Sequence, residues 1–343
     1  MPDPPALPPA AREAILAWYE RHGRSLPFRA TADPYAVLVS ETMAQQTQAA
    51  RAGEAWLRFV ALFPTVSALA AAAPSEVLRA WQGLGYNRRA LNLWRAAGRI
   101  VEEHGGQVPA DLAALEALPG VGPYTARAVA AIGFGQPIGA VDTNVRRVLG
   151  RIVTGAAGGL APKPMQALAD RVVPRDRPAA WTHALMDLGA TVCRPRRPNC
   201  EACPALEWCR FAAQREVDPA GAAGQDRRSG TGRATAGEWP AVRVRPAARE
   251  RPAARERPAA RERPPPFVTT SRWLRGRIVD RLRAVPDGSW TPIGGPIGSH
   301  GRAAVAAALA TLAREGLIEI DPTDAKPGGG PRVAGVRARL PIG

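Results

Sequence analysis

The 343-residue sequence predicts an all-α N-terminal part followed by a small α+β module. Apolar residues recur at helical spacing in one segment after another up to residue 153, and alternating strand patterns are almost absent there. Of all residues, 46% are apolar, which is enough to bury a core. Near the C-terminus two further helices and a short β-branched run predict the smaller, winged-helix-like module.

The predicted helices have clear start and stop signals. Asp33-Pro34 and Ala73-Pro74 precede two of them, and Gly83 ends a third. In the last module a glycine turn leads into the strand-like run Gly316–Asp321. The predicted helices are Ala11–His22, Tyr35–Ala49, Glu54–Phe63, Val66–Ala72, Pro74–Gln82, Arg88–His104, Leu112–Ala117, Pro123–Ile132, Thr143–Val153, Ser271–Leu282 and Ala303–Glu315.

Charge and proline content divide the chain into residues 1–213, 214–266 and 267–343. The middle part repeats RPAARE three times between residues 245 and 262, and the proline in each repeat prevents a continuous helix, so we expect a disordered linker. The formal net charge of +16 favours a polyanionic partner such as nucleic acid. No apolar run could span a membrane and no signal-peptide pattern is present, so we expect a cytoplasmic, nucleoid-associated protein without membrane contact.

The segment LPGVGPYTA, residues 118–126, lies between two predicted helices. Gly120 and Gly122 permit tight turns that a side chain would block, and the N–H groups at the start of the next helix suit a phosphate. The segment therefore predicts a helix-hairpin-helix that contacts DNA phosphate through Gly120, Val121, Gly122 and Thr125. An ordinary helical hairpin with a glycine turn is the alternative.

Two acidic residues are candidates for chemistry. Asp142 stands at a predicted helix start, where a structural N-cap is the simplest interpretation, although a capping carboxylate can still be functional. Glu41 is the one charged residue of its helical segment and has apolar neighbours. Burial would raise the pKa of Glu41 and suit it to general acid catalysis, whereas an exposed helix glutamate is the alternative.

The four cysteines of the chain lie within 17 residues, as Cys193-x6-Cys200-x2-Cys203-x5-Cys209. Such clustering indicates a metal centre rather than a disulfide scaffold. Four thiolates can hold zinc or a [4Fe–4S] cluster, and the spacing alone leaves both open.

Together these motifs resemble the helix-hairpin-helix DNA glycosylase superfamily, which includes endonuclease III, over about residues 8–212. Within it the chain looks like the adenine DNA glycosylase branch, and the cysteine spacing matches the superfamily's [4Fe–4S] pattern. The resemblance implies two helical lobes. The matching segments are Arg24–Arg29, Asp33–Tyr35, Ser40–Gln48, Gly83–Tyr86, Val141–Val145 and Ala184–Ala190.

The resemblance implies a role for each site residue. Glu41 would protonate a flipped adenine, Asp142 would stabilise the cationic sugar, and Tyr124 would position the sugar or Asp142. Tyr86 would act as an aromatic wedge in the duplex. The partner would be double-stranded DNA with an A·8-oxoguanine or A·G mispair, and we expect a monomer. Residues expected at the base pocket or the lesion are Arg24, Leu26, Arg29, Gln46, Gln48, Tyr86 and Asp187.

Lysine scarcity predicts the type of glycosylase. The endonuclease III branch uses a hairpin lysine to cut the strand, but Tyr124 occupies that position, and the only lysines are Lys163 and Lys326. We therefore expect a monofunctional enzyme without strong AP-lyase activity.

Other features depart from the branch. Phe28, Ala44 and Asp187 differ from its usual residues, and residues 267–343 do not resemble its Nudix-like domain. The alternatives are a thymine or uracil glycosylase acting on G·T or G·U and a non-enzymatic DNA-damage-binding protein.

Overall fold

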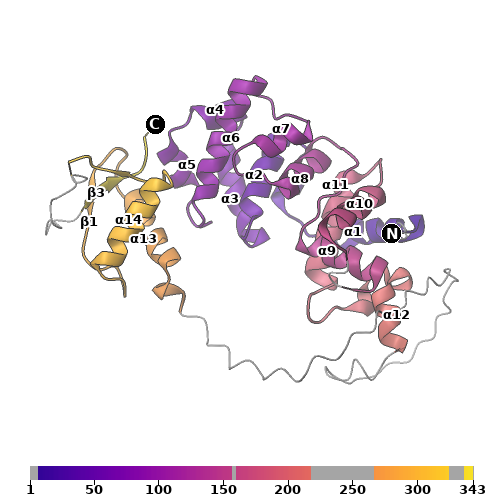
Figure 1. Cartoon of the computed structure of the whole chain (residues 1–343). Coiled ribbons are helices and arrows are strands. Elements are labelled where there is room, and N and C mark those ends of the chain that lie inside the picture. Colours follow the sequence, from indigo (N-terminus) through magenta and orange to yellow (C-terminus); the bar gives the residue numbers. More distant parts are fainter. Residues whose placement is uncertain (1–6, 157–159, 218–265, 324–335, 343) are drawn as a thin grey trace.

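The computed structural model describes residues 7–156, 160–217, 266–323 and 336–342 (Figure 1). The part up to Val217 is helical, and two helices with a small sheet form the C-terminal end. The three RPAARE repeats of the expected linker lie outside the described residues. None of the described helices is long and apolar enough to cross a membrane.

The helices before Val217 gather around two separate apolar cores, as a two-lobed fold requires. One core is formed mainly by α2 (Pro34–Ala44), α3 (Ala49–Leu62), α4 (Val66–Ala71), α5 (Pro74–Ala80), α6 (Arg88–His104), α7 (Leu112–Ala117) and α8 (Pro123–Gly133). The other is formed mainly by α1 (Pro9–His22), α9 (Thr143–Leu149), α10 (Pro162–Val172) and α11 (Pro178–Asp187), with α12 (Arg210–Val217) after the cysteine loop.

Helix α2 lies at the centre of the first lobe. Asp33 caps it, because its carboxylate accepts hydrogen bonds from the N–H groups of Tyr35 and Ala36. Nine consecutive residues from Tyr35 to Met43 are buried, so the helix is enclosed on all sides, which its nearly uncharged sequence permits. Glu41 is therefore buried because the apolar residues around it in α2 are buried.

Several predicted helices have different bounds. The helix expected at Tyr35–Ala49 ends at Ala44, because Gln46 takes a positive φ of 54° and the chain restarts as α3. The helix expected at Thr143–Val153 changes at Gly150 into a π-helical turn, Gly150–Thr154. Helices α10 and α11 were not predicted, although both begin at a proline in the first helical turn.

The C-terminal module contains α13 (Ser271–Arg283), α14 (Arg302–Arg314) and the strands β1 (Thr291–Ile293), β2 (Glu319–Ile320) and β3 (Val336–Arg339). Its antiparallel sheet has the order β1-β3-β2, with Thr291 opposite Ala338 and Glu319 opposite Arg339. The strand expected in Gly316–Asp321 is confirmed as β2. The other two strands are too short to show alternation in the sequence.

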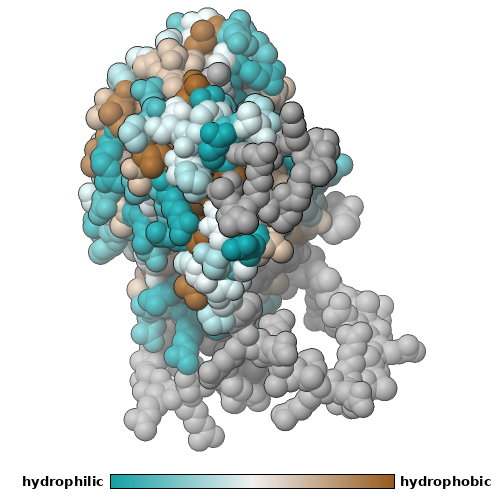
Figure 2. Space-filling model, turned by 90° about the vertical axis from the view of Figure 1, so that its left-hand side faces the viewer, coloured by the Kyte–Doolittle hydropathy of each residue, from teal (hydrophilic) through white to brown (hydrophobic). Residues whose placement is uncertain are grey.

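The module packs against α5 of the first lobe through two reciprocal arginines. Arg79 of α5 donates to the carbonyl of Val285 at 2.9 Å, beyond the end of α13, and Arg283 of α13 donates to the carbonyl of Leu78 at 2.9 Å. Each guanidinium thus binds near the C-terminal end of the other helix, where the helix dipole favours a cation. The view onto this end of the molecule is mainly hydrophilic, with scattered apolar residues (Figure 2).

Candidate active site and cysteine centre

Glu41 is a buried carboxyl group. Only 8% of the residue is exposed, and burial raises its pKa from 4.5 to about 7. A hydrogen bond with Tyr124 and the charge of Arg29 act in the opposite direction, and the nearby Asp142 adds to the rise. A carboxyl group with this pKa is partly protonated near neutral pH, so Glu41 can act as a general acid.

Asp142 approaches Glu41 from the other lobe. It caps α9: one carboxylate oxygen accepts from the N–H of Val145 at 2.7 Å and the other from the side-chain amide of Asn144 at 2.8 Å. Tyr124 on α8 lies beside Glu41, and burial together with both carboxylates raises the pKa of its phenol, which stays neutral. The structure thus brings together the three residues expected to be catalytic, at the junction of the lobes.

A chain of hydrogen bonds connects Asp142 to the cysteine loop. Arg147, only 9% exposed, donates to the side-chain oxygen of Asn144 at 2.8 Å and to the carbonyl of Cys193 at 2.7 Å. Asn144 in turn donates to Asp142. Arg147 was not predicted as a site residue, although it lies two positions after the matching segment Val141–Val145.

Asp187 was expected at the base pocket, but the structure places it in a buried ion-pair cluster. It is 0% exposed, and its carboxylate accepts two hydrogen bonds from Arg29, both at 2.7 Å, and further ones from Arg24. Burial acts to raise the pKa of Asp187, but these bonds outweigh it and lower the pKa. These bonds fix the position of Arg29, whose charge acts on Glu41.

The Tyr86 loop, residues 83–86, lies beside the C-terminal end of α2. The half-buried Arg89 donates to the carbonyls of Thr42 and Met43 at the end of α2 and to those of Leu84 and Gly85 in the loop. Burial lowers the pKa of Arg89 to about 10. Arg89 was missed in the sequence, where an arginine inside a helix gives no signal of its contacts.

The residues expected to contact the lesion occupy this same region. Gln46 and Gln48 follow α2 and are exposed, and Tyr86 is 39% exposed. Gln46 and Tyr86 are the two non-glycine residues with positive φ in the described part of the chain. Such strain is frequent at functional sites. Leu26 is partly buried against the first core, and Phe28 is buried with its ring edge against Trp56.

The hairpin residues do not share one role. Gly120 has a φ of +79°, and a Cβ there would lie 2.7 Å from the Cβ of Asn92, so this position requires glycine. Gly122 was expected to form a tight turn as well, but its φ is −97° and nothing lies within 4 Å of a Cβ there. A Cβ at Gly122 would therefore meet neither backbone strain nor a clash with the described residues.

Two further hairpin residues were expected to contact the phosphate, but their side chains point into the protein. Val121 is 8% exposed, and its N–H already donates to the carbonyl of Leu118 at 3.1 Å. Thr125 is 3% exposed, and its hydroxyl accepts from the side-chain amide of Gln45 at 3.2 Å. Thr125 therefore ties the hairpin helix α8 to the end of α2.

The two hairpin glycines predict opposite outcomes. Gly120→Ala should lower the free energy of unfolding by roughly 1–3 kcal/mol, because it combines a strained φ with a clash. Gly122→Ala should leave stability unchanged but weaken duplex DNA binding about tenfold, the effect of one lost charge-assisted hydrogen bond. Urea denaturation and fluorescence anisotropy would measure the two quantities. A Gly122→Ala protein that binds duplex normally would argue against a phosphate at this turn.

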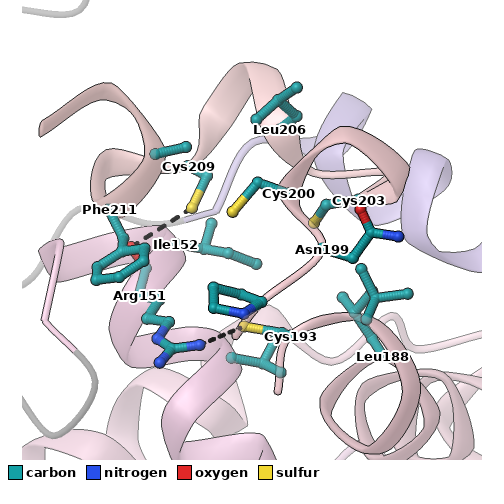
Figure 3. A pocket seen from close by; sticks show the side chains of 14 residues that line it. Arg151, Ile152, Leu188, Cys193, Asn199, Cys200, Cys203, Leu206, Cys209 and Phe211 are labelled. Carbon is teal, nitrogen blue, oxygen red and sulfur yellow. Dashed lines mark hydrogen bonds between the residues drawn. The ribbon is translucent and has the colours of Figure 1, made fainter. Parts of the chain in front are cut away.

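The four cysteines line one small cavity of about 20 Å³ with apolar walls that include Ile152 and Leu188. Their sulfur atoms face a common space (Figure 3). The guanidinium of Arg151 donates to the Cys193 sulfur at 3.4 Å and closes one side. Among the described residues, no three His, Cys, Asp or Glu side chains stand close enough to share a single metal ion.

Comparison with known proteins places this site in a family. A family model described as "HhH-GPD superfamily base excision DNA repair protein" matches residues 39–174. The adenine DNA glycosylase of Mycolicibacterium smegmatis is 45% identical over 199 residues, which are 57% of this chain and 68% of that protein. The chain belongs to the HhH-GPD superfamily. Its hairpin and acidic pair therefore lie within a known base-excision-repair fold.

Other relatives of this HhH-GPD protein are also adenine DNA glycosylases. The one from Mycobacterium tuberculosis (strain H37Rv) is 48% identical over 57% of this chain, and the human one 43% identical over 59%. The chain spans 65% of the M. tuberculosis protein and 39% of the human protein, so it matches only part of each.

Solved structures support the same fold. A thermostable thymine-DNA glycosylase is 30% identical and has a TM-score of 0.56, covering 59% of this chain and 95% of its own. An endonuclease III–DNA covalent intermediate is 24% identical, with a TM-score of 0.52 and coverage of 60% and 95%. The second likeness concerns the fold alone.

Proposed function

We propose that this protein is a monofunctional DNA glycosylase that removes adenine mispaired with 8-oxoguanine or guanine. The observation that carries the proposal is the buried Glu41, whose pKa near 7 provides a proton donor beside Asp142. Protonation matters for adenine in particular, because the neutral base is a poor leaving group. Similarity to adenine DNA glycosylases from mycobacteria and human supports the same substrate.

The proposed reaction begins after the adenine leaves the base stack, at a cost of a few kcal/mol. Glu41 gives its proton to a ring nitrogen of adenine. The N-glycosidic bond then breaks, and its electron pair leaves with the base. The sugar becomes an oxocarbenium-like cation beside the carboxylate of Asp142. Water adds to the anomeric carbon and loses its proton to a carboxylate, so the products are free adenine and an abasic site.

The same residues favour hydrolysis over strand cleavage. A β-lyase needs an amine that forms a Schiff base with the sugar. The hairpin offers the phenol of Tyr124 instead, and Lys163, the one lysine among the described residues, is exposed on α10. We therefore propose that the abasic site is released intact. An enzyme with this substrate acts on chromosomal DNA, which agrees with a cytoplasmic, nucleoid-associated location.

We also propose a [4Fe–4S] cluster held by Cys193, Cys200, Cys203 and Cys209. The residues fit this group, since four cysteine sulfurs face one space with apolar walls. Burial raises the pKa of Cys203 to about 12, so iron would be needed to keep its thiolate. When bound, the cluster would cross-link the loop that receives the Arg147 hydrogen bond.

The cofactor proposal predicts an iron-loaded protein. Anaerobically purified protein should be brown and contain about four irons and four sulfides per chain. Cys203→Ser should lose visible absorption and iron and unfold at lower temperature, because the loop then loses its cross-link. Metal analysis together with a thermal melt would measure both effects. A colourless wild-type protein that contains stoichiometric zinc would refute the assignment.

The substrate proposal is tested by single-turnover release of bases from four duplexes, which carry A·8-oxoguanine, A·G, G·T and G·U. We expect adenine release from the first two and no release from the others. Thymine or uracil release alone would instead favour the alternative enzyme, which the likeness to a thymine-DNA glycosylase structure keeps in view. Binding without any release would favour a damage-binding protein.

A further inference from the structure

The C-terminal module contacts the Tyr86 loop through one side chain. Arg272, at the start of α13, donates to the Tyr86 hydroxyl at 2.6 Å, and its guanidinium carbon lies 3.8 Å from the centre of the Tyr86 ring. On its other side, Arg272 approaches the ring of Phe267 at 5.7 Å. Phe267 is 58% exposed, so two exposed aromatic rings flank an exposed guanidinium.

This contact concentrates positive charge. Arg89 lies 5.6 Å from the same Tyr86 ring, and repulsion by Arg272 contributes to the lowered pKa of Arg89. In the described part of the chain, neither arginine has a carboxylate partner: Arg89 binds carbonyls and a hydroxyl, and Arg272 binds a phenol. Within the described residues, the buried Nε of Arg89 has no hydrogen-bond partner. Asp280 lines the groove beside Arg272, but it pairs with Arg277 and Arg283. Arg89 and Arg272 therefore keep their positive charge available for an anion.

Arg272 and Tyr86 line a groove of about 450 Å³ at the junction of the module and the first lobe. Its walls include Tyr86, Asn87, Phe267, Arg272 and Arg277. Arginines beside exposed aromatic rings are the combination that binds nucleic acid, since guanidinium groups pair with phosphates and rings stack on bases.

The Tyr86 loop, which lines the groove, lies next to the catalytic part. Arg89 joins the Tyr86 loop to the end of α2, and Glu41 lies one helical turn before that end. Duplex DNA that brings a base to Glu41 must therefore pass close to Tyr86. In addition, residues 267–343 contain eleven arginines and lysines against six acidic residues, so the module as a whole favours DNA.

We propose that this groove binds the phosphodiester backbone of duplex DNA next to the target base pair, with Arg272 as the direct phosphate contact. Tyr86 holds Arg272 by stacking and by its hydroxyl. The proposed wedge, Tyr86 of the first lobe, and the proposed phosphate contact, Arg272 of the C-terminal module, therefore act together. The module is then a component of the DNA-binding surface. This inference rests on the proposed glycosylase function and assigns part of its substrate to new residues.

The test measures binding of the full-length chain to a duplex with an A·8-oxoguanine pair. Every variant carries Glu41→Gln, so that the bound duplex stays intact. Arg272→Ala should weaken binding about tenfold and reduce the slope of log Kd against log salt by about one, the effect of one lost phosphate contact. Arg272→Lys keeps the charge but not the planar stack, so it should keep the salt slope.

Arg302→Ala is the matched control. Arg302 is exposed and carries the same charge as Arg272. It begins α14, whereas Leu312, near the other end of this helix, lines the groove. Arg302→Ala should leave Kd and salt slope unchanged. Equal values for Arg272→Ala and Arg302→Ala would overturn the proposal. The groove proposal is tested by duplex binding alone, without base release. The glycosylase proposal is tested separately, by base release from the wild-type protein, so the failure of one proposal is distinguishable from the failure of the other.

Discussion

Glu41→Gln is expected to lower the single-turnover rate constant of adenine release by a factor of about 10²–10⁴, the usual contribution of a general acid. Glutamine keeps the size and polarity of the side chain but cannot give a proton to the base. The rate constant is measured by quenching the reaction of excess protein with an A·8-oxoguanine duplex. Duplex affinity should stay within a few-fold of the wild type, because Glu41 is buried and contributes no phosphate contact.

The pH profile provides an independent check. Glu41 must be protonated to act, and its pKa is about 7. The wild-type rate constant should therefore be level below pH 7 and fall tenfold per unit above it, while the residual rate of Glu41→Gln should lack this limb. A variant that loses binding and activity in parallel would instead make Glu41 a structural residue.

Glu41→Gln should affect stability in the opposite sense to activity: the variant loses base release but not folding stability. The folded pKa of Glu41 lies above the unfolded value, so the folded protein holds the proton more tightly and its stability falls as pH rises from about 4.5 to 7. Glu41→Gln removes this penalty, and at pH 8 the variant should be at least as stable as the wild type. The native glutamate is thus retained at a cost in stability, as is common for active-site groups.

The sequence predicted the fold class and most helices because apolar spacing and caps are local signals. Arg88–His104 and Leu112–Ala117 have the predicted bounds. The prediction that the helix continues from α2 to Ala49 was wrong. The chain turns at Gln46, which has a positive φ, and Arg89 binds the last carbonyls of α2 from 46 and 47 residues away. A contact of this kind leaves no periodic pattern in either segment.

The candidate site was predictable in composition but not in arrangement. Residue type and motif order identified Glu41, Asp142 and Tyr124, yet whether Glu41 is buried depends on the packing of two lobes. For the same reason, the surroundings of Gly122 and Asp187 could not be predicted from the sequence. A glycine gives no sign of whether its neighbour is the protein or a ligand, and an aspartate gives none of which arginines will reach it.

The second large effect concerns Asp187. Asp187→Asn should lower the free energy of unfolding by about 3–5 kcal/mol, the usual result of removing one partner from a buried ion pair. The side chain of Arg29 is 9% exposed and would keep its charge with half of its bonds lost. Urea denaturation at pH 7 measures the change. Asp287→Asn is the matched control, since Asp287 pairs with Arg79 at 3.1 Å on the surface and is 47% exposed.

The control should cost at most about 1 kcal/mol, because an exposed pair is solvated in both states. The pH dependence separates charge from packing. Arg29 and Arg24 lower the pKa of Asp187 below its unfolded value, so its stabilisation is complete above about pH 4 and is lost as pH falls further. The difference between wild type and Asp187→Asn should therefore shrink in acid. A difference independent of pH, or equal losses for Asp187→Asn and Asp287→Asn, would show that the buried cluster does not hold Arg29 by charge.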